Sequence, residues 1–331
     1  MKKLWGIISV IALLTVIVAG CGSNNSTNES ASTPADQTAS TEQSAPAAEQ
    51  PTERTIEYLG ETYTVPANVE RIVITGSIEA HEDALVLDVH PVGAVSFSGQ
   101  FPERFASILD QAQSIGEKTE PNFETILSLK PDVILGTTKF PEEVVEQLKK
   151  IAPTILVSHI ATDWEANILM LGELTGKTTQ AEEAIANYKT TIESAKSTLT
   201  DKLQDKEVVA LRVRSGKLFM YPSTVFYNSF LYGDLGLKVP ETITAVKAQE
   251  ALSIEQLAAM NPDYLILQSA TDENADNQNA LQELLDNPII QQITAAKEDH
   301  IYVNLVDPLS EGGPAWSRIN FLDALLDKLG Q

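Results

Sequence analysis

Short apolar segments alternate with amphipathic segments along the middle of the chain. The pattern predicts strands at 71–75, 92–95, 132–135 and 154–157, with helices after two of them, at 80–87 and 141–150. A strand, a short loop and a helix in repeated succession are typical of parallel crossover units. Ahead of them, residues 55–65 alternate between apolar and polar around Gly60, which predicts a hairpin.

A long helical segment divides this pattern in two. From 164 to 203 the chain is helical in character, with one break at Thr175-Gly176-Lys177. The part after the break lacks Gly and Pro, and about twenty residues of helix run roughly 30 Å, the scale of a small domain. Strands resume at 208–213, 218–221, 264–268 and 301–304. We therefore expect an α/β protein with lobes at 55–175 and 205–331 and a connecting helix at 176–204.

An internal repeat supports two equivalent lobes. Residues 122–135 and 253–266 each contain a short amphipathic helix, a Pro-Asp pair that ends it and an apolar strand. Glu124 and Glu255 take the same place in the two copies. Because one copy falls in each expected lobe, the lobes are expected to be structural duplicates.

The N-terminus carries an export signal. Lys2 and Lys3 precede an apolar run at 4–18, which is too short for a comfortable membrane span. The run ends in Val-Ala-Gly-Cys, which resembles the lipobox of bacterial lipoproteins and predicts cleavage of residues 1–20 and a lipid on Cys21. Cys21 is the only cysteine, so it has no intramolecular disulfide partner. An ordinary secretory signal with an incidental cysteine is the alternative.

The segment after Cys21 is predicted to be a disordered tether. Residues 21–54 are rich in Ser, Thr, Asn, Gln, Ala, Pro and Glu and almost without large apolar groups. Such a segment buries too little surface to offset its chain entropy. About thirty flexible residues span on the order of 30 Å, enough for a folded body to clear a membrane surface.

The overall charge makes local clusters of cations informative. The formal net charge is −23, and it becomes −25 once Lys2 and Lys3 leave with the signal. A body this acidic does not bind nucleic acid or an anionic membrane through a general electrostatic field. A local cluster of Lys and Arg in this chain therefore calls for a specific explanation, separate from the overall charge.

Four cations lie where a parallel sheet binds its ligands, beyond the carboxyl ends of strands. Lys139 follows the strand at 132–135, and Lys118 follows Ser-Ile-Gly at 114–116. Arg212 and Arg214 alternate with apolar residues at the end of a strand, so both point to one face. Two arginines in a covered sheet are costly unless they meet anions. The alternatives are a solvated surface charge for each lysine and, for the arginines, ion pairs with buried carboxylates.

Taken together, these features resemble the iron-siderophore (cobalamin-type) class of ABC-transporter substrate-binding proteins over nearly the whole chain. Six short motifs resemble, in order, members of that class that bind ferric catecholates: Ile-Thr-Gly-Ser at 74–77, Ser-Phe-Ser-Gly at 96–99, Gly-Glu-Lys at 116–118, Thr-Lys-Phe-Pro at 138–141, Leu-Tyr-Gly-Asp-Leu-Gly at 231–236 and Val-Asp-Pro-Leu at 306–309. The resemblance implies two Rossmann-like lobes joined by a single long helix, the class III periplasmic-binding-protein fold.

The resemblance also implies a ligand and its site. The ligand is an iron(III) tricatecholate siderophore of the bacillibactin or enterobactin kind, which carries three negative charges. The siderophore holds the iron, so neither a direct metal ligand nor a cofactor is expected. The matching positions are a basic triad of Lys118, Lys139 and Arg214, with Arg212 and Gln249 beside it and Ser215 where the family has a glutamine.

The implied partners are those of an importer. The protein is expected to be a monomer, lipid-anchored at Cys21 on the extracellular face of a Gram-positive cell membrane. It delivers its ligand to an ABC permease dimer driven by an ATPase. Glu124 and Glu255 are expected to contact the permease, one from each lobe, although the helix dipole alone also favours acids at a helix start.

Other chemistry finds little support in the sequence. The four histidines are scattered without a His-x-x-x-His pair, which argues against a zinc or manganese binder. The chain has no Gly-x-Ser-x-Gly elbow, phosphate loop or Gly-x-Gly-x-x-Gly motif, so we expect no enzyme. His159 and Trp164 are expected to be packing or rim residues. The same role for a hydroxamate siderophore, haem or cobalamin stays an alternative, and a secreted hydrolase is a distant one.

Overall fold

The computed structural model describes residues 52–329, which belong to one compact unit. The predicted signal peptide, Cys21 and nearly all of the tether therefore lie outside the described residues. The described part begins with the predicted hairpin, β1 (Glu53–Tyr58) and β2 (Glu61–Pro66), which pair antiparallel.

The first lobe is built on a six-stranded sheet in the order β6-β5-β4-β3-β7-β8. Its strands are parallel except β6, which pairs antiparallel with β5. Every residue of β3, β4 and β7 is buried, as expected for strands covered on both faces. The strands are β3 (Ile72–Ile74), β4 (Gly93–Ser96), β5 (Gln113–Glu117), β6 (Glu120–Pro121), β7 (Val133–Thr137) and β8 (Thr154–Val157). The helices are α1 (Ile78–Leu87), α2 (Ala106–Leu109), α3 (Phe123–Ser128) and α4 (Glu142–Lys149).

The second lobe is built on a five-stranded sheet in the order β11-β10-β9-β12-β13. Strands β9, β12 and β13 are parallel, whereas β10 pairs antiparallel with both of its neighbours, β9 and β11. The strands are β9 (Val208–Arg214), β10 (Lys217–Met220), β11 (Glu250–Leu252), β12 (Tyr264–Ser269) and β13 (Ile301–Val303). The helices are α7 (Glu241–Ala245), α8 (Ile254–Met260), α9 (Ala280–Leu285) and α10 (Thr294–Lys297), with a π-helix at Ser229–Asp234 and 3-10 turns at Asp272–Asn274 and Ile290–Gln292. The first half of the chain has 3-10 turns at Glu103–Phe105 and Ala161–Asp163.

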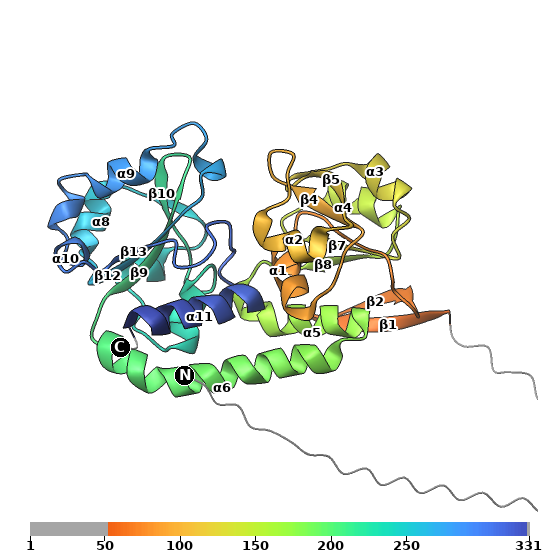
Figure 1. Ribbon diagram of the computed structural model, residues 1–331, viewed down its shortest axis with the longest axis horizontal. Coiled ribbons are helices and arrows are strands. Elements are labelled where there is room, and N and C mark those ends of the chain that lie inside the picture. Colours follow the sequence, from red (N-terminus) through yellow and green to blue (C-terminus); the bar gives the residue numbers. More distant parts are fainter. Residues whose placement is uncertain (1–51, 330–331) are drawn as a thin grey trace, which may run out of the picture. The chain divides into compact units, whose positions relative to one another are not determined.

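Two consecutive helices run between the sheets. Helix α5 (Trp164–Thr175) ends at Gly176, whose φ of 72° closes the helix in the left-handed region. Helix α6 (Thr178–Leu203) has 26 residues and so runs roughly 39 Å. Figure 1 shows it, in green, passing beneath both sheets. Its buried stripe recurs every three or four residues, at Ala181, Ile185, Tyr188, Ile192, Ala195, Leu199 and Leu203.

The internal repeat occupies equivalent places in the two sheets. Strand β7 pairs with β3 and β8, and β12 pairs with β9 and β13. The aspartate of each Pro-Asp pair anchors the start of the neighbouring strand. Asp132 accepts hydrogen bonds from the backbone N–H groups of Glu70 and Arg71, and Asp263 accepts one from Glu207. This anchoring explains why both copies keep Asp at that position.

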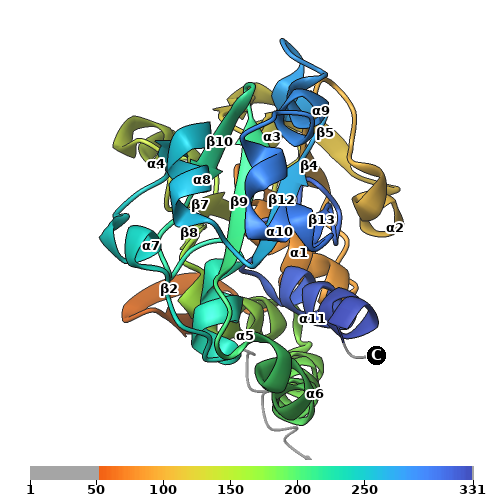
Figure 2. The ribbon, with the colours of Figure 1, turned by 90° about the vertical axis from the view of Figure 1, so that its left-hand side faces the viewer.

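The prediction of two α/β lobes joined by one long helix is confirmed. Two of the expected boundaries need correction. The tether was expected to extend to residue 54, whereas Glu53 and Arg54 already belong to β1. The sequence pattern assigned all of 205–331 to the second lobe, whereas α11 (Ala315–Leu329) packs against α1, α5 and α6. Figures 1 and 2 both place it next to α6. The helix returns because its apolar side, including Phe321, Leu322 and Leu325, is buried there. Among residues 52–329, none of the helices combines the length with the apolar character that crossing a bilayer requires.

Candidate ligand-binding site

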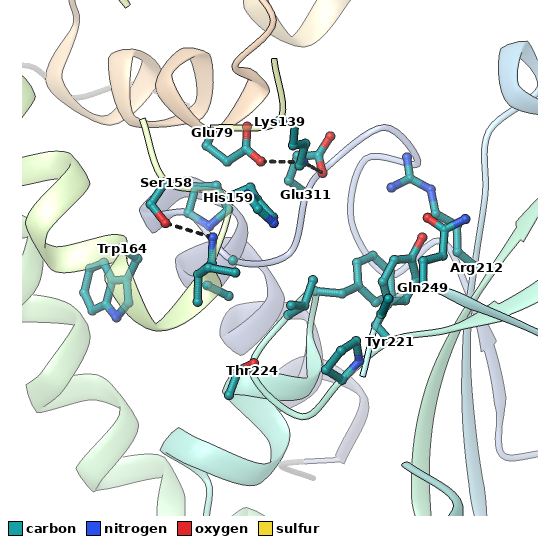
Figure 3. Close-up of a pocket in the computed structure, with 18 of the residues that line it drawn as sticks. Glu79, Lys139, Ser158, His159, Trp164, Arg212, Tyr221, Thr224, Gln249 and Glu311 are labelled. Carbon is teal, nitrogen blue, oxygen red and sulfur yellow. Dashed lines mark hydrogen bonds and ion pairs between the residues drawn. The ribbon is translucent and has the colours of Figure 1, made fainter. Parts of the chain in front are cut away.

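A cavity of about 510 Å³ is lined by residues from both lobes. Figure 3 shows Glu79 and Lys139 of the first lobe on one side and Arg212, Tyr221 and Gln249 of the second on the other. Lys139 follows β7 and Arg212 lies near the end of β9, so the cavity lies at the carboxyl ends of parallel strands. This is where open α/β sheets bind ligands.

Most of the predicted ligand-binding residues come together at this cavity. Lys118, Lys139, Arg212, Arg214 and Gln249 all belong to its lining. Ser215 does not. It lies in the turn between β9 and β10 with a φ of 48°, and its N–H donates to the backbone oxygen of Glu273. The backbone turns away from the cavity at that position, so a role for Ser215 in direct contact finds no support in this geometry.

The two lysines of the first lobe are paired with carboxylates. Lys118, in the turn between β5 and β6, lies 2.5 Å from Glu311 Oε1. Lys139 lies 2.9 Å from Glu79 Oε1 and 4.0 Å from Glu311 Oε2. Burial lowers the pKa of Lys139, but Glu311 and Glu79 outweigh it and hold the pKa above its usual value. Lys139 therefore presents positive charge to the cavity.

The two arginines of the second lobe share one carboxylate. Glu273 Oε2 lies 2.7 Å from Arg212 Nε, and Oε1 lies 3.4 Å from an Arg214 amino nitrogen. The ion pair considered as an alternative from the sequence is thus present, and it coexists with the cavity. Burial lowers the pKa of Arg212, but Glu311 and Glu273 together raise it above its usual value. Arg214 is more open, with 40 % of its side chain exposed.

A carboxylate that sequence reasoning missed lies among these cations. Glu311 sits on the loop between β13 and α11, in Glu-Gly-Gly-Pro at 311–314, and its side chain is 14 % exposed. Burial raises its pKa, but Lys118, Lys139 and Arg212 outweigh burial and hold the pKa well below its usual range. The loop is distant in sequence from every predicted site residue, so spacing carried no signal for it.

Two further charged residues line the cavity without having been predicted. Glu79, in the first turn of α1, is 4 % exposed at its side chain and pairs with Lys139. Lys247 lies two residues before Gln249, in Lys-Ala-Gln-Glu at 247–250. That stretch was the available signal for Lys247. Glu79 carried none beyond its position at a helix start.

The rest of the lining is largely apolar. Ile160, Trp164, Pro222, Val225 and Phe226 line the cavity. Trp164 is only 5 % exposed and packs edge-on against Tyr188 with ring centroids 5.2 Å apart, so it is a packing residue with one face on the cavity. This surface suits aromatic or aliphatic parts of a ligand.

His159 also reaches the cavity, as a rim residue. Its Nδ1 lies 2.8 Å from Thr138 Oγ1, beside the turn that carries Lys139. Burial and the charge of Lys139 both lower the pKa of His159, so its ring is neutral near neutral pH. Within 52–329, no three His, Cys, Asp or Glu side chains gather as a metal site.

The cavity carries positive charge in a strongly acidic chain. Its lining holds five cations and two carboxylates, whereas the whole sequence has a net charge of −23. Counted this way, the lining has an excess of three positive charges, and two remain once Glu273, which pairs with both arginines from behind the lining, is included. Such a cavity is built to bind a polyanion whose remaining surface is apolar.

Glu124 and Glu255 lie away from this cavity at matching positions. Each is the second residue of its helix, after Asn122 as N-cap of α3 and Ser253 as N-cap of α8. Both glutamates are exposed. Figures 1 and 2 place α3 and α8 on the side of the body away from α6. The geometry therefore offers two exposed acids in equivalent settings, one on each lobe.

Comparisons with known proteins identify relatives. A family model described as "Periplasmic binding protein" matches residues 80–304. The chain is 47 % identical over 331 residues, the full length of both, to the iron-uptake system-binding protein of Bacillus subtilis. It is 30 % identical over 244 residues to a probable siderophore-binding lipoprotein, YfiY, of the same species, covering 73 % of this chain and 69 % of that one.

A solved structure adds a bound ligand to the comparison. It is that of the triscatecholate siderophore binding protein FeuA from Bacillus subtilis, complexed with ferri-bacillibactin. The two structures superpose with a TM-score of 0.81 at 50 % identity, covering 84 % of this chain and 98 % of the other. The class III fold expected from the sequence is therefore confirmed.

Proposed function

Because the chain belongs to the periplasmic binding protein family, we propose that it captures an iron(III) tricatecholate siderophore in the cavity between its lobes. The family consists of substrate-binding proteins, and the chain is one of them, not an enzyme. The observation that carries the choice of ligand is the excess of positive charge on the cavity lining of an acidic chain. The relative that binds ferri-bacillibactin supports the same choice.

The charges give the proposal its energetic basis. An iron(III) tricatecholate carries three negative charges, and the cavity keeps an excess of positive charge even after Glu79, Glu311 and Glu273 are counted. A charge pair about 4 Å apart is worth roughly 4 kcal/mol at an effective dielectric of 20, before desolvation. The apolar lining, with Trp164 and Phe226, then receives the aromatic rings. A neutral ferric hydroxamate makes no use of the cations, and haem would engage them only through its two propionates.

Tryptophan fluorescence provides the test, because Trp164 lines the cavity. Titration of the purified protein with a ferric tricatecholate should quench the emission with a stoichiometry of one. The bound siderophore should be recovered unchanged, since no turnover is expected. Trp164→Phe should lose most of the quenching while calorimetry still detects binding, which places the ligand in this cavity.

Two results would overturn the proposal. One is tighter binding of a neutral ferric hydroxamate than of the tricatecholate, which would favour the hydroxamate alternative. The other is hydrolysis of the ligand during the titration, which would favour an enzyme.

We also propose how the protein delivers its ligand. A lipid on Cys21 would hold it on the extracellular face of the cell membrane, and the segment from residue 22 to the start of β1 would give the body its reach. Glu124 and Glu255 would contact an ABC permease dimer, one glutamate per lobe, and an ATPase would drive import. Exposed acids at equivalent helix starts support this arrangement, since paired sites on the binding protein suit a two-fold permease. The protein would act as a monomer.

A further inference from the structure

The Glu311 carboxylate lies where an anionic ligand would meet the first-lobe lysines. One oxygen is 2.5 Å from Lys118 Nζ, and the other is 4.0 Å from Lys139 Nζ. Its charge also acts on Arg212 across the cavity. Figure 3 shows Glu311 beside Lys139, on the side of the cavity opposite Arg212 and Gln249. One carboxylate thus serves cations from both lobes.

The main chain holds this carboxylate in place independently of the lysines. The N–H of Glu311 donates to Glu82 Oε1 at 2.8 Å, and Glu82 is fully buried on α1. Arg104 donates to Leu309 O at 3.1 Å and pairs with Asp307, so the same loop is tied to the first lobe at a second point. The loop is therefore positioned before any ligand arrives, and the side chain of Glu311 is directed at the cations.

A fixed carboxylate among cations changes what an incoming anion gains. Without it, Lys118 would lose the carboxylate 2.5 Å from its Nζ, Lys139 and Arg212 would keep only Glu79 and Glu273, and a small anion would be attracted more strongly. With the Glu311 carboxylate in place, a small anion that reaches one or two of these cations gains little, because it replaces an ion pair that already exists. A large polyanion that reaches all of them, and Arg214 as well, gains more contacts than it displaces.

We propose that Glu311 is a built-in competitor that excludes small inorganic anions from the cavity and reserves it for polyanions that span both lobes. The proposal rests on the proposed function for the identity of the polyanion. The exclusion of small anions by Glu311 can be tested without any siderophore.

The experiment is a calorimetric titration of the purified protein with inorganic phosphate near neutral pH at fixed ionic strength. Wild type should bind phosphate only weakly. Glu311→Gln should bind it at least about tenfold more tightly, because the amide no longer neutralises Lys118 and removes the second negative charge near Lys139. Glu311→Ala is the second variant and should show the same gain. Both retain the backbone N–H that donates to Glu82, so the loop should stay in place, and thermal unfolding checks that the fold is retained.

Glu146→Gln is the matched control. It also removes one carboxylate from an ion pair, with Lys149 at 3.1 Å, but both side chains are more than half exposed on α4. This control should leave phosphate affinity within about twofold of wild type. An equal gain in the control would show that net charge alone is responsible, and it would overturn the proposal. Folded Glu311 variants with unchanged phosphate affinity would overturn it too.

A siderophore arm separates this inference from the proposed function. Phosphate should compete with the ferric tricatecholate in Glu311→Gln at concentrations that leave wild type unaffected. If wild type does not bind the tricatecholate, the proposed function fails while the phosphate titration still decides the role of Glu311. If wild type binds it and phosphate competes equally in both proteins, the exclusion role is wrong and the proposed function stands.

Discussion

Lys139 provides a test that separates a direct contact with the ligand from a general effect of charge. Its Nζ lies 2.9 Å from Glu79 Oε1, so Lys139→Ala removes a ligand-facing cation and also leaves Glu79 without its partner. Adding Glu79→Gln removes the stranded carboxylate and restores the net charge of the cavity. The single and double variants therefore share the missing contact but differ in charge balance.

The stability effect follows from the exposure of the two side chains. Glu79 is 4 % exposed, whereas Lys139 is 41 % exposed. Removing one partner of a fully buried pair costs about 3–5 kcal/mol, and an exposed pair is worth about 0–1 kcal/mol. This half-open pair lies between them, so Lys139→Ala should lower the free energy of unfolding by about 1–3 kcal/mol. The double variant should recover most of that loss.

The binding effect should behave differently. A hydrogen bond to a charged group contributes about 1.5–3 kcal/mol, so Lys139→Ala should weaken tricatecholate binding roughly ten- to hundredfold. Because Glu79→Gln supplies no donor to the ligand, the double variant should remain at least about tenfold weaker than wild type. Stability is then restored while affinity is not.

Urea unfolding and fluorescence titration measure the two quantities on the same samples. Lys149→Ala is the control, since its partner Glu146 is exposed and lies on α4 outside the cavity lining. It should change neither quantity by a measurable amount. Wild-type affinity in the double variant would refute the direct contact and would show that net charge alone attracts the ligand.

Three further predictions concern the anchor, the permease and a buried histidine. Cys21→Ser should release the protein into the medium or leave it unprocessed, and unchanged lipid labelling with normal membrane retention would contradict the lipobox. Replacing Glu124 and Glu255 together by Ala should impair iron uptake while ligand affinity stays intact, and undiminished uptake by the correctly displayed variant would exclude their role. Burial lowers the pKa of His81 to about 4, and its Nδ1 donates to Ser77 O, so between pH 4 and 6.5 the unfolded chain binds the proton and the folded one does not. The free energy of unfolding should therefore rise by about 3 kcal/mol across that pH window because of His81. His81→Asn should remove this contribution to the pH dependence, and an unchanged pH dependence in that variant would refute the prediction.

Much of the fold could be predicted because its signals are local. The apolar runs of β3, β7 and β9 report strands buried on both faces, and the break at Gly176 separates α5 from α6. Strand β5 and the short strands β6 and β11 were missed. Residues 250–252 have no apolar run, and β11 exists because β10 supplies its hydrogen-bond partners. The return of α11 to α1 and α6 depends on long-range packing, which a local pattern does not contain.

The site residues also separate into those with a local sequence signal and those placed only by the tertiary fold. Lys118, Lys139, Arg212, Arg214 and Gln249 could be placed on one cavity because strand ends and family motifs mark them. Their acidic partners could not. Glu79, Glu273 and Glu311 reach the cations only through the tertiary fold, and nothing in their sequence neighbourhoods distinguishes them from the chain's many other acids. A sequence rich in Asp and Glu conceals the few carboxylates that matter.

The central claim is that the cavity recognises the negative charge of a tricatecholate complex, and a charge series tests it most directly. One tricatecholate ligand is loaded with iron(III), gallium(III) or titanium(IV), which are similar in size and give complexes of charge −3, −3 and −2. A neutral ferric hydroxamate completes the series, and calorimetry measures each affinity at one ionic strength. The iron and gallium complexes should bind equally within about twofold, the titanium complex roughly tenfold more weakly, and the hydroxamate most weakly of all. Equal affinity across the series, or tightest binding of the neutral complex, would contradict recognition by charge.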